Sequence, residues 1–186
     1  MYRAVNKIFA ILLLFLLAFP LIIIFILVKL TSNGPAIYWS KRIGKNNLIF
    51  KMPKFRSMVT NTPQLATHLL NDSGNFLTPL GGFLRKTSLD ELPQLFSIIK
   101  GDMVFVGPRP ALYNQSNLIK LRTENGVHKL FPGITGLAQI TGRDELSIND
   151  KVSLDIEYLV KKTLWLDLKI IFLTLYKVSI KQGVSH

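Results

Sequence analysis

The chain of 186 residues contains no cysteine, which excludes disulfide bonds, a thiolate nucleophile and cysteine-ligated metal sites. It also lacks the patterns GxxxxGK[ST] and GxGxxG, so the P-loop ATPase and Rossmann classes are without their fingerprints. The three histidines, His68, His128 and His186, do not have the spacing of metal ligands. The chemistry of this protein must therefore come from carboxylates, hydroxyls and cationic side chains.

Acidic residues are scarce: 11 aspartates and glutamates stand against 23 lysines and arginines, giving a net charge of +12. Such a surplus indicates an anionic partner, which is nucleic acid, acidic lipid or a phosphorylated substrate. The mean hydropathy is nevertheless positive, at +0.31. Because no nucleic-acid-binding motif is present, the combination favours a protein at a membrane surface over a nucleic-acid binder.

One long apolar run, from Ile8 to Val28, contains no charged residue. As a helix it would be about 31 Å long, enough to cross a bilayer. A cleaved signal peptide is a competing interpretation, but the run is longer than the usual ~7–15 residues and no small-x-small site follows it. Pro20 predicts a break in the helix. Because basic residues flank both ends, the positive-inside rule favours a helix that breaks at Pro20 and returns to the same face over one that spans.

The remainder has a mixed pattern. Two short strands are expected at 36–39 and 48–52, joined by a basic hairpin turn at 41–47. Helices are expected at 62–70, at 88–100, and from about Ser116 and Ile148 onward. We therefore predict an α/β fold, mostly α with a small β-hairpin, with a membrane element at 1–30 and a catalytic domain at 31–186.

The C-terminal segment is amphipathic. Its apolar residues recur at helical spacing from Leu164 to Val178, and Trp165 and Tyr176 suit a helix in the lipid headgroup region. The same pattern is equally typical of a helix that closes an ordinary core. Both interpretations stay open at this point.

An acidic pair lies in the segment LRKTSLDELP. Ser88 and Glu91 have the spacing of a capping box, and Asp90 with Glu91 would complement the helix dipole. The same placement fits phosphate chemistry, because Arg85 adds positive potential to a helix start. Asp90 would then attack phosphorus, and Glu91 would hold Mg²⁺. The structural and the catalytic interpretations are compatible.

Three further segments have residues suited to phosphate. The segment 51–58 contains three cations and a hydroxyl, and it is either an anion site or a solvated strand edge. Arg109 stands between Pro108 and Pro110, whose rings restrict it and so suit a rigid bidentate grip. The glycine-rich stretch that ends at Arg143 is either plain turn structure or part of a phosphate site.

Five segments occur in one order along nearly the whole chain: KFRSM (54–58), LRKTSLDELPQL (84–95), VGPRP (106–110), PGITGLAQITGR (132–143) and LDIEYL (154–159). Together they resemble the bacterial sugar transferase family. More narrowly, they resemble the small monotopic phosphoglycosyl transferases that start glycan assembly on undecaprenyl phosphate. Each segment alone is weak, but their order makes the resemblance specific.

The resemblance implies a two-step reaction. Asp90 would attack the β-phosphate of a UDP-sugar, expelling UMP and leaving a sugar-phosphoryl aspartate. Undecaprenyl phosphate would then attack this intermediate, while Glu91 helps to hold the required Mg²⁺. The other positions that match the family, with expected roles at the substrate or in support of the site, are Lys54, Arg85, Arg109, Arg143 and Asp155.

The resemblance also implies a location and partners. It predicts a monotopic protein on the cytoplasmic face of the bacterial inner membrane, with a re-entrant helix broken at Pro20 and interfacial amphipathic helices. The family commonly has Ser-Pro at the break, whereas this chain has Phe19 before the proline. Expected partners are the UDP-sugar, undecaprenyl phosphate, phospholipids and downstream glycosyltransferases, with no nucleic acid. The short form is similar to members acting on N-acetylated amino sugars, and glucose and galactose donors stay open.

Two other functions account for part of the pattern. A membrane-anchored polyprenyl-phosphate phosphatase would release inorganic phosphate without any UDP-sugar. A non-catalytic scaffold that binds anionic ligands would explain the charge, but it gives no reason for Asp90 and Glu91 among clustered cations. Substitution of Asp90 by asparagine separates the enzymatic functions from the scaffold, because only the former depend on its carboxylate.

Overall fold

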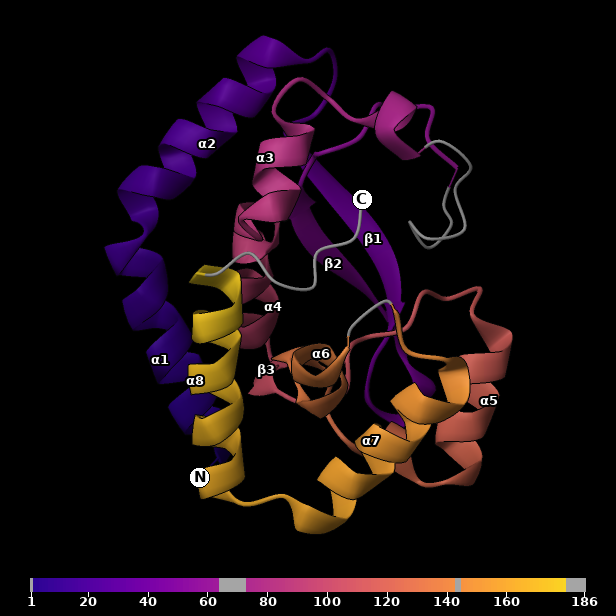
Figure 1. Cartoon of the computed structure of the whole chain (residues 1–186). Coiled ribbons are helices and arrows are strands. Elements are labelled where there is room, and N and C mark those ends of the chain that lie inside the picture. Colours follow the sequence, from indigo (N-terminus) through magenta and orange to yellow (C-terminus); the bar gives the residue numbers. More distant parts are fainter. Residues whose placement is uncertain (1, 64–72, 143–144, 180–186) are drawn as a thin grey trace.

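A computed structural model describes residues 2–63, 73–142 and 145–179. Most of the helix expected at 62–70, and Arg143, lie outside these ranges. The described part of the chain is mainly helical, as predicted, and contains two small sheets where one hairpin was expected (Figure 1). From the amino end its helices and strands are α1 (Tyr2–Leu16), α2 (Ala18–Thr31), β1 (Ile37–Ile43), β2 (Ile49–Phe55), α3 (Gly81–Lys86), α4 (Leu95–Lys100), β3 (Val104–Val106), α5 (Ser116–Glu124), β4 (Gly133–Thr135), α6 (Leu137–Thr141), α7 (Ile148–Lys161) and α8 (Leu164–Ser179).

The long apolar run forms two helices, α1 and α2, whose axes are bent by 65° at Leu17. We predicted the break at Pro20, and it therefore lies three residues before the predicted position. Pro20 has no N–H to bond the carbonyl of Leu16, and its ring presses on that carbonyl, so the distortion appears one turn earlier. Among the described residues no helix alone is long and apolar enough to cross a membrane, but this bent pair together has the required length and composition.

The inner side of the bent pair packs on the rest of the molecule. Ala10 of α1 is buried against Ile98 of α4 and Met103. Val28 of α2 is buried against Phe55 of β2 and Leu84 of α3. In Figure 1 the two helices run along one side of the molecule, with their other side facing outward. The bent pair thus packs on the rest of the described chain through two buried hydrophobic clusters.

The hairpin β1–β2 is antiparallel and places Tyr38 opposite Lys54. The turn predicted at 41–47 was too long, because 41–43 continue strand β1. Only 44–48 form the connection, and Asn46 and Asn47 adopt positive φ angles of 55° and 60°. Asparagine tolerates this left-handed conformation, which allows a tight turn. Because β1 is longer than predicted, Arg42, which we expected in a loop, lies on the same face of the hairpin as Lys54.

A second sheet, in which β3 and β4 run parallel, was not predicted. Each strand has three residues, too few to show alternation, and glycine and proline in both segments indicated turns. The glycines have a different purpose: a Cβ on Gly133 would collide with the backbone nitrogen of Gly107. Close approach of the two backbones requires glycine at this point.

The helix predicted for 88–100 is divided in two. Residues Leu89–Gln94 form a 3₁₀ turn and only Leu95–Lys100 is α-helical. The capping box is wrong, because Ser88 has a left-handed φ of 56° and its side chain caps no backbone N–H. Helix α3, which contains Leu84, is followed by a sharp turn into the 3₁₀ segment. As a result, the side chain of Glu91 bonds Lys54 and does not reach back to Ser88.

A buried cluster joins the two ends of the described chain. The hydroxyl of Tyr2 donates to Asp167 Oδ2 at 2.6 Å. The hydroxyl of Tyr158 lies 2.7 Å from Asp167 Oδ1 and 3.1 Å from the carbonyl oxygen of Val106. Asp167 is only 4% exposed. The bond between Tyr2 and Asp167 therefore joins the start of α1 to α8, and Figure 1 shows the two helices side by side.

Substitution of Tyr158 by phenylalanine tests this cluster. It leaves an oxygen of the buried Asp167 with one donor fewer, which costs about 1–3 kcal/mol. We expect a clearly lower melting temperature in detergent, with Tyr176→Phe as the matched control because Tyr176 is 56% exposed. Equal melting temperatures for the two variants would contradict this account.

Candidate active site

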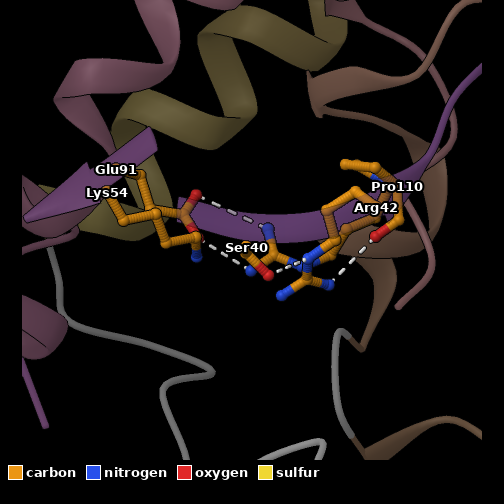
Figure 2. Close-up of polar contacts among 6 residues, drawn as sticks. Ser40, Arg42, Lys54, Glu91 and Pro110 are labelled. Carbon is orange, nitrogen blue, oxygen red and sulfur yellow. Dashed lines mark hydrogen bonds and ion pairs between the residues drawn. The ribbon is translucent and has the colours of Figure 1, made fainter. Parts of the chain in front are cut away.

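The acidic pair lies at the junction of three parts of the fold. Asp90 and Glu91 belong to the 3₁₀ turn between α3 and α4, Lys54 to β2, and Arg109 to the loop after β3. Lys54 Nζ and Arg109 Nη2 each lie 2.7 Å from Glu91 Oε1. Figure 2 shows Lys54 and Glu91 at one end of a row of polar contacts. Glu91 thus joins the hairpin to the Arg109 loop through one oxygen atom.

Burial and charge drive the two carboxyl groups in opposite directions. Burial raises the pKa of Asp90 to about 6, against the opposing effect of Lys54. Burial would also raise the pKa of Glu91, but Arg109 and Lys54 outweigh it and hold that pKa well below its ordinary value. Two neighbouring acids with pKa values pushed apart are typical of a site in which they have different roles.

Two of the other predicted cations lie at this pair. Arg85, at the end of α3, lowers the pKa of Asp90 through its charge, and its Nη1 lies 3.4 Å from Met58 Sδ. Arg109 has a side chain that is 43% exposed, although it bonds Glu91. Its guanidinium can therefore reach a dissolved anion. The structure brings Lys54, Arg85 and Arg109 together around Asp90, as the sequence predicted.

Asp155 occupies a different place. It is 2% exposed and binds Arg122 through Oδ2, at 2.9 Å from Nε and 2.6 Å from Nη2. Arg122 Nη1 in turn donates to the carbonyl oxygen of Arg109 at 2.8 Å. Asp155 therefore reaches the site only through Arg122. The sequence analysis missed Arg122; the available signal was an arginine one helical turn after Leu118, on the buried face of α5.

Arg42 and Ser40 were also missed. Arg42 Nε donates to Ser40 Oγ at 2.9 Å, and Nη1 donates to the carbonyl oxygen of Pro110 at 3.1 Å. Figure 2 shows these contacts continuing the row from Glu91 to Pro110. These contacts could not be predicted while Arg42 was assigned to a turn at 41–47. Residues 40 and 42 share one face only when both belong to a strand.

The carboxylates fit a magnesium ion that shares its ligands with a substrate. Mg²⁺ prefers oxygen and is commonly held by one or two carboxylates together with substrate phosphates. Glu91 Oε2 has only a 3.5 Å contact to Arg109, whereas Oε1 receives both short bonds. Within the described ranges no cluster of three potential acidic or histidine ligands exists. Any such ion would therefore depend on the substrate for its remaining ligands.

Two carboxyl groups with opposed pKa shifts, faced by three cations, have the composition of a phosphate-handling site. Comparison of the chain with known protein families agrees with such a site. Residues 1–181 match the bacterial sugar transferase family. The chain belongs to this family, which confirms the resemblance inferred from its five segments.

Several relatives cover most of the chain. The undecaprenyl-phosphate glucose phosphotransferase of Komagataeibacter xylinus is 41% identical over 93% of this chain. The undecaprenyl-phosphate galactose phosphotransferase of Salmonella typhimurium is 38% identical over 90% of it. The chain spans only 35% and 38% of these two proteins. It spans 86% of the exopolysaccharide production protein ExoY of Sinorhizobium fredii, at 36% identity over 97% of the chain.

The raised pKa of Asp90 predicts a gain in stability when the charge is removed. A carboxyl whose folded pKa of about 6 exceeds its unfolded value destabilises the fold as pH rises through that range. Asp90→Asn should therefore raise the free energy of unfolding at pH 7–8, by an amount on the order of 3 kcal/mol, and with it the melting temperature. The gain should vanish below about pH 4, where the carboxyl is protonated in both states.

The matched control is Glu124→Gln, because the Glu124 side chain is 52% exposed. It should change the melting temperature little at any pH. A lower melting temperature for Asp90→Asn at pH 8 would show that the charge of Asp90 stabilises the fold and would contradict the prediction.

Proposed function

We propose that this chain is a phosphoglycosyl transferase that moves a sugar phosphate from a UDP-sugar to undecaprenyl phosphate. The observation that carries the proposal is the Asp90–Glu91 pair, in which one acid is poised near neutrality and the other is locked in its ionised form by Lys54 and Arg109. The names of the relatives in Komagataeibacter and Salmonella agree with it, because both are undecaprenyl-phosphate sugar phosphotransferases.

In the first step a carboxylate oxygen of Asp90 attacks the β-phosphorus of the donor. The bond from that phosphorus to the bridging oxygen breaks, UMP leaves, and a sugar-phosphoryl aspartate forms. In the second step a phosphate oxygen of undecaprenyl phosphate attacks the same phosphorus and releases Asp90. The product is an undecaprenyl diphosphosugar, and no other co-reactant is needed.

The cations supply the charge that such a transfer requires. Phosphoryl transfer is mainly positioning and charge stabilisation, and Arg109 is exposed enough to bind the donor phosphates while it holds Glu91. Glu91 would help to hold Mg²⁺, which would neutralise charge on the diphosphate of the donor. The residue Glu91 is kept ionised for this purpose by Lys54 and Arg109.

We further propose that the protein is monotopic and faces the cytoplasm of a bacterial inner membrane, where UDP-sugars are available. The bent pair α1–α2 presents large apolar side chains outward, including Phe15 at 87% and Phe19 at 73% exposure. Helix α8 buries Ile170 but exposes Trp165 and Phe172. Its two sides therefore fit both open interpretations: one face closes the core, and the other suits phospholipid headgroups.

The identity of the sugar also belongs to the proposal. The names of the two relatives make glucose and galactose the first donors to test, ahead of the N-acetylated amino sugars expected from the sequence. The product is a lipid-linked diphosphosugar, so a glycosyltransferase that extends it is the natural downstream partner.

The direct test is release of UMP in detergent with Mg²⁺, with and without undecaprenyl phosphate. UDP-glucose, UDP-galactose and UDP-N-acetylhexosamines should each be tried. We expect lipid-dependent UMP from at least one donor and a loss of at least 10³-fold in Asp90→Asn, because the nucleophile is removed. Glu124→Gln should keep full activity. Release of inorganic phosphate from undecaprenyl phosphate, without UMP from any donor, would instead establish the phosphatase alternative.

The pKa of Asp90 predicts an acid limb in the reaction. The nucleophile must be ionised, so kcat/KM for the donor should fall about tenfold per pH unit below a pKa of about 6 and should be level just above it. Lys54→Gln removes the charge that most opposes the effect of burial, so its limb should move to higher pH. A limb that stays in place in this variant would show that another group controls it.

A further inference from the structure

The Arg109 loop connects the two sheets of the molecule. On one side, the N–H of Gly107 donates to Thr135 at 2.9 Å and that of Gly133 donates to Pro108 at 2.9 Å. On the other side, the N–H of Ile43 donates to Ala111 at 2.9 Å, and Arg42 forms a β-bridge with Leu112. Ladder-like backbone bonds thus fix both ends of the loop. They leave the two residues between those ends, 109 and 110, to be fixed by other groups.

Side chains fix these two residues. The carbonyl oxygen of Arg109 accepts from Arg122 Nη1 at 2.8 Å. The carbonyl oxygen of Pro110 accepts from Arg42 Nη1 at 3.1 Å. Prolines at 108 and 110 have no N–H, so this segment cannot be held by a regular ladder. Two guanidinium groups from different elements, α5 and β1, take over that task.

Each of the two guanidinium groups is itself held in place. Arg122 is fixed by Asp155, whose Oδ2 lies 2.9 Å from Nε and 2.6 Å from Nη2. Arg42 is fixed by Ser40, whose Oγ accepts from Nε at 2.9 Å. A donor that is rigid before it binds loses little entropy on bonding a carbonyl. The arrangement therefore defines where the backbone of Arg109 can lie.

The energetics indicate a role in geometry more than in stability. Desolvation offsets most of the attraction in a buried ion pair, so an apolar pair of similar size would often stabilise a fold equally well. Arg122 and Asp155 are 11% and 2% exposed as side chains. Beneath the loop lies a cavity of about 30 Å³, lined in part by Arg122 and His128.

We propose that Arg42 and Arg122 are positioning residues that set the backbone at Arg109–Pro110, so that the guanidinium of Arg109 meets Glu91 and the donor phosphate together. This inference rests on the proposed function. It assigns no direct contact with substrate to either residue. Both residues act through Arg109, and this dependence makes the proposal testable.

The test is a pair of double-mutant cycles. Arg42→Gln and Arg122→Gln are each made in the wild type and in Arg109→Ala, and kcat/KM for the UDP-sugar and the Kd of UDP with Mg²⁺ are measured. A misplaced binding group costs up to about 10²-fold, so we expect each single variant to lose about 10- to 100-fold in kcat/KM. In the Arg109→Ala background the same changes should cost less than about threefold.

Two controls separate geometry from charge and from folding. Arg42→Lys keeps the charge but cannot bond Ser40 and Pro110 together, so it should restore little of the activity. Arg56 also binds backbone carbonyls, at Ser32 and Asn33, but these lie at the end of α2 and not in the Arg109 loop. Losses in Arg56→Gln should therefore be equal in the wild-type and Arg109→Ala backgrounds.

The outcomes are distinct. Equal losses in both backgrounds for Arg42→Gln and Arg122→Gln, in an active enzyme, overturn the positioning role and leave the proposed function intact. Binding of UDP without UMP release from any donor overturns the proposed function, and the cycle is then read from the Kd values. If Arg109→Ala changes neither kcat/KM nor Kd, Arg109 has no role for these residues to support and the inference fails.

Discussion

One oxygen atom, Glu91 Oε1, receives the ammonium group of Lys54 and the guanidinium of Arg109 at equal distances of 2.7 Å. Lys54 belongs to β2 and Arg109 to the loop after β3, so the contact ties the hairpin to that loop. Burial raises the pKa of Asp90, and the charges of Lys54, Arg85 and Arg109 oppose that rise only in part. The near-neutral pKa of Asp90 is therefore a result of burial, whereas the low pKa of Glu91 is a result of the two cations that bond it.

The fold around this contact explains why its parts come from distant places in the chain. The hairpin supplies Lys54, the 3₁₀ turn supplies the acids, and a loop between the sheets supplies Arg109. The close backbone contact at Gly107 and Gly133 lets that loop leave the β3–β4 sheet in the right direction. A site assembled from three rigid segments holds its charges in place without help from the substrate.

The sequence predicted those features that depend on local pattern. The acidic pair, the basic residues near it and the broken apolar helix were all visible in short segments. The break itself was misplaced by three residues, because proline acts on the carbonyl one turn before it. The capping box failed since Ser88 is left-handed, a property set by the turn out of α3 and not by the spacing to Glu91.

Contacts between distant segments were beyond local pattern. Arg42 is 68 residues from Pro110, and Arg122 is 33 residues from Asp155. No periodicity in the sequence relates such positions. The strands β3 and β4 were missed for a similar reason, because three residues gain their structure from a partner 29 positions away, as the pairing of Val104 with Gly133 shows.

The buried bonds between Tyr2 and Asp167 have a consequence for how the chain folds. Tyr2, at the start of α1, has its polar partner, Asp167, 165 residues later in the chain. Until the later parts of the chain have been made, the inward side of α1 lacks its partners, Ile98 and Met103 beside Ala10 and Asp167 beside Tyr2, and exposed apolar surface of this kind promotes aggregation. Early entry of α1 and α2 into a lipid bilayer would shelter this surface during synthesis. A bilayer would then serve as a folding partner for the bent pair.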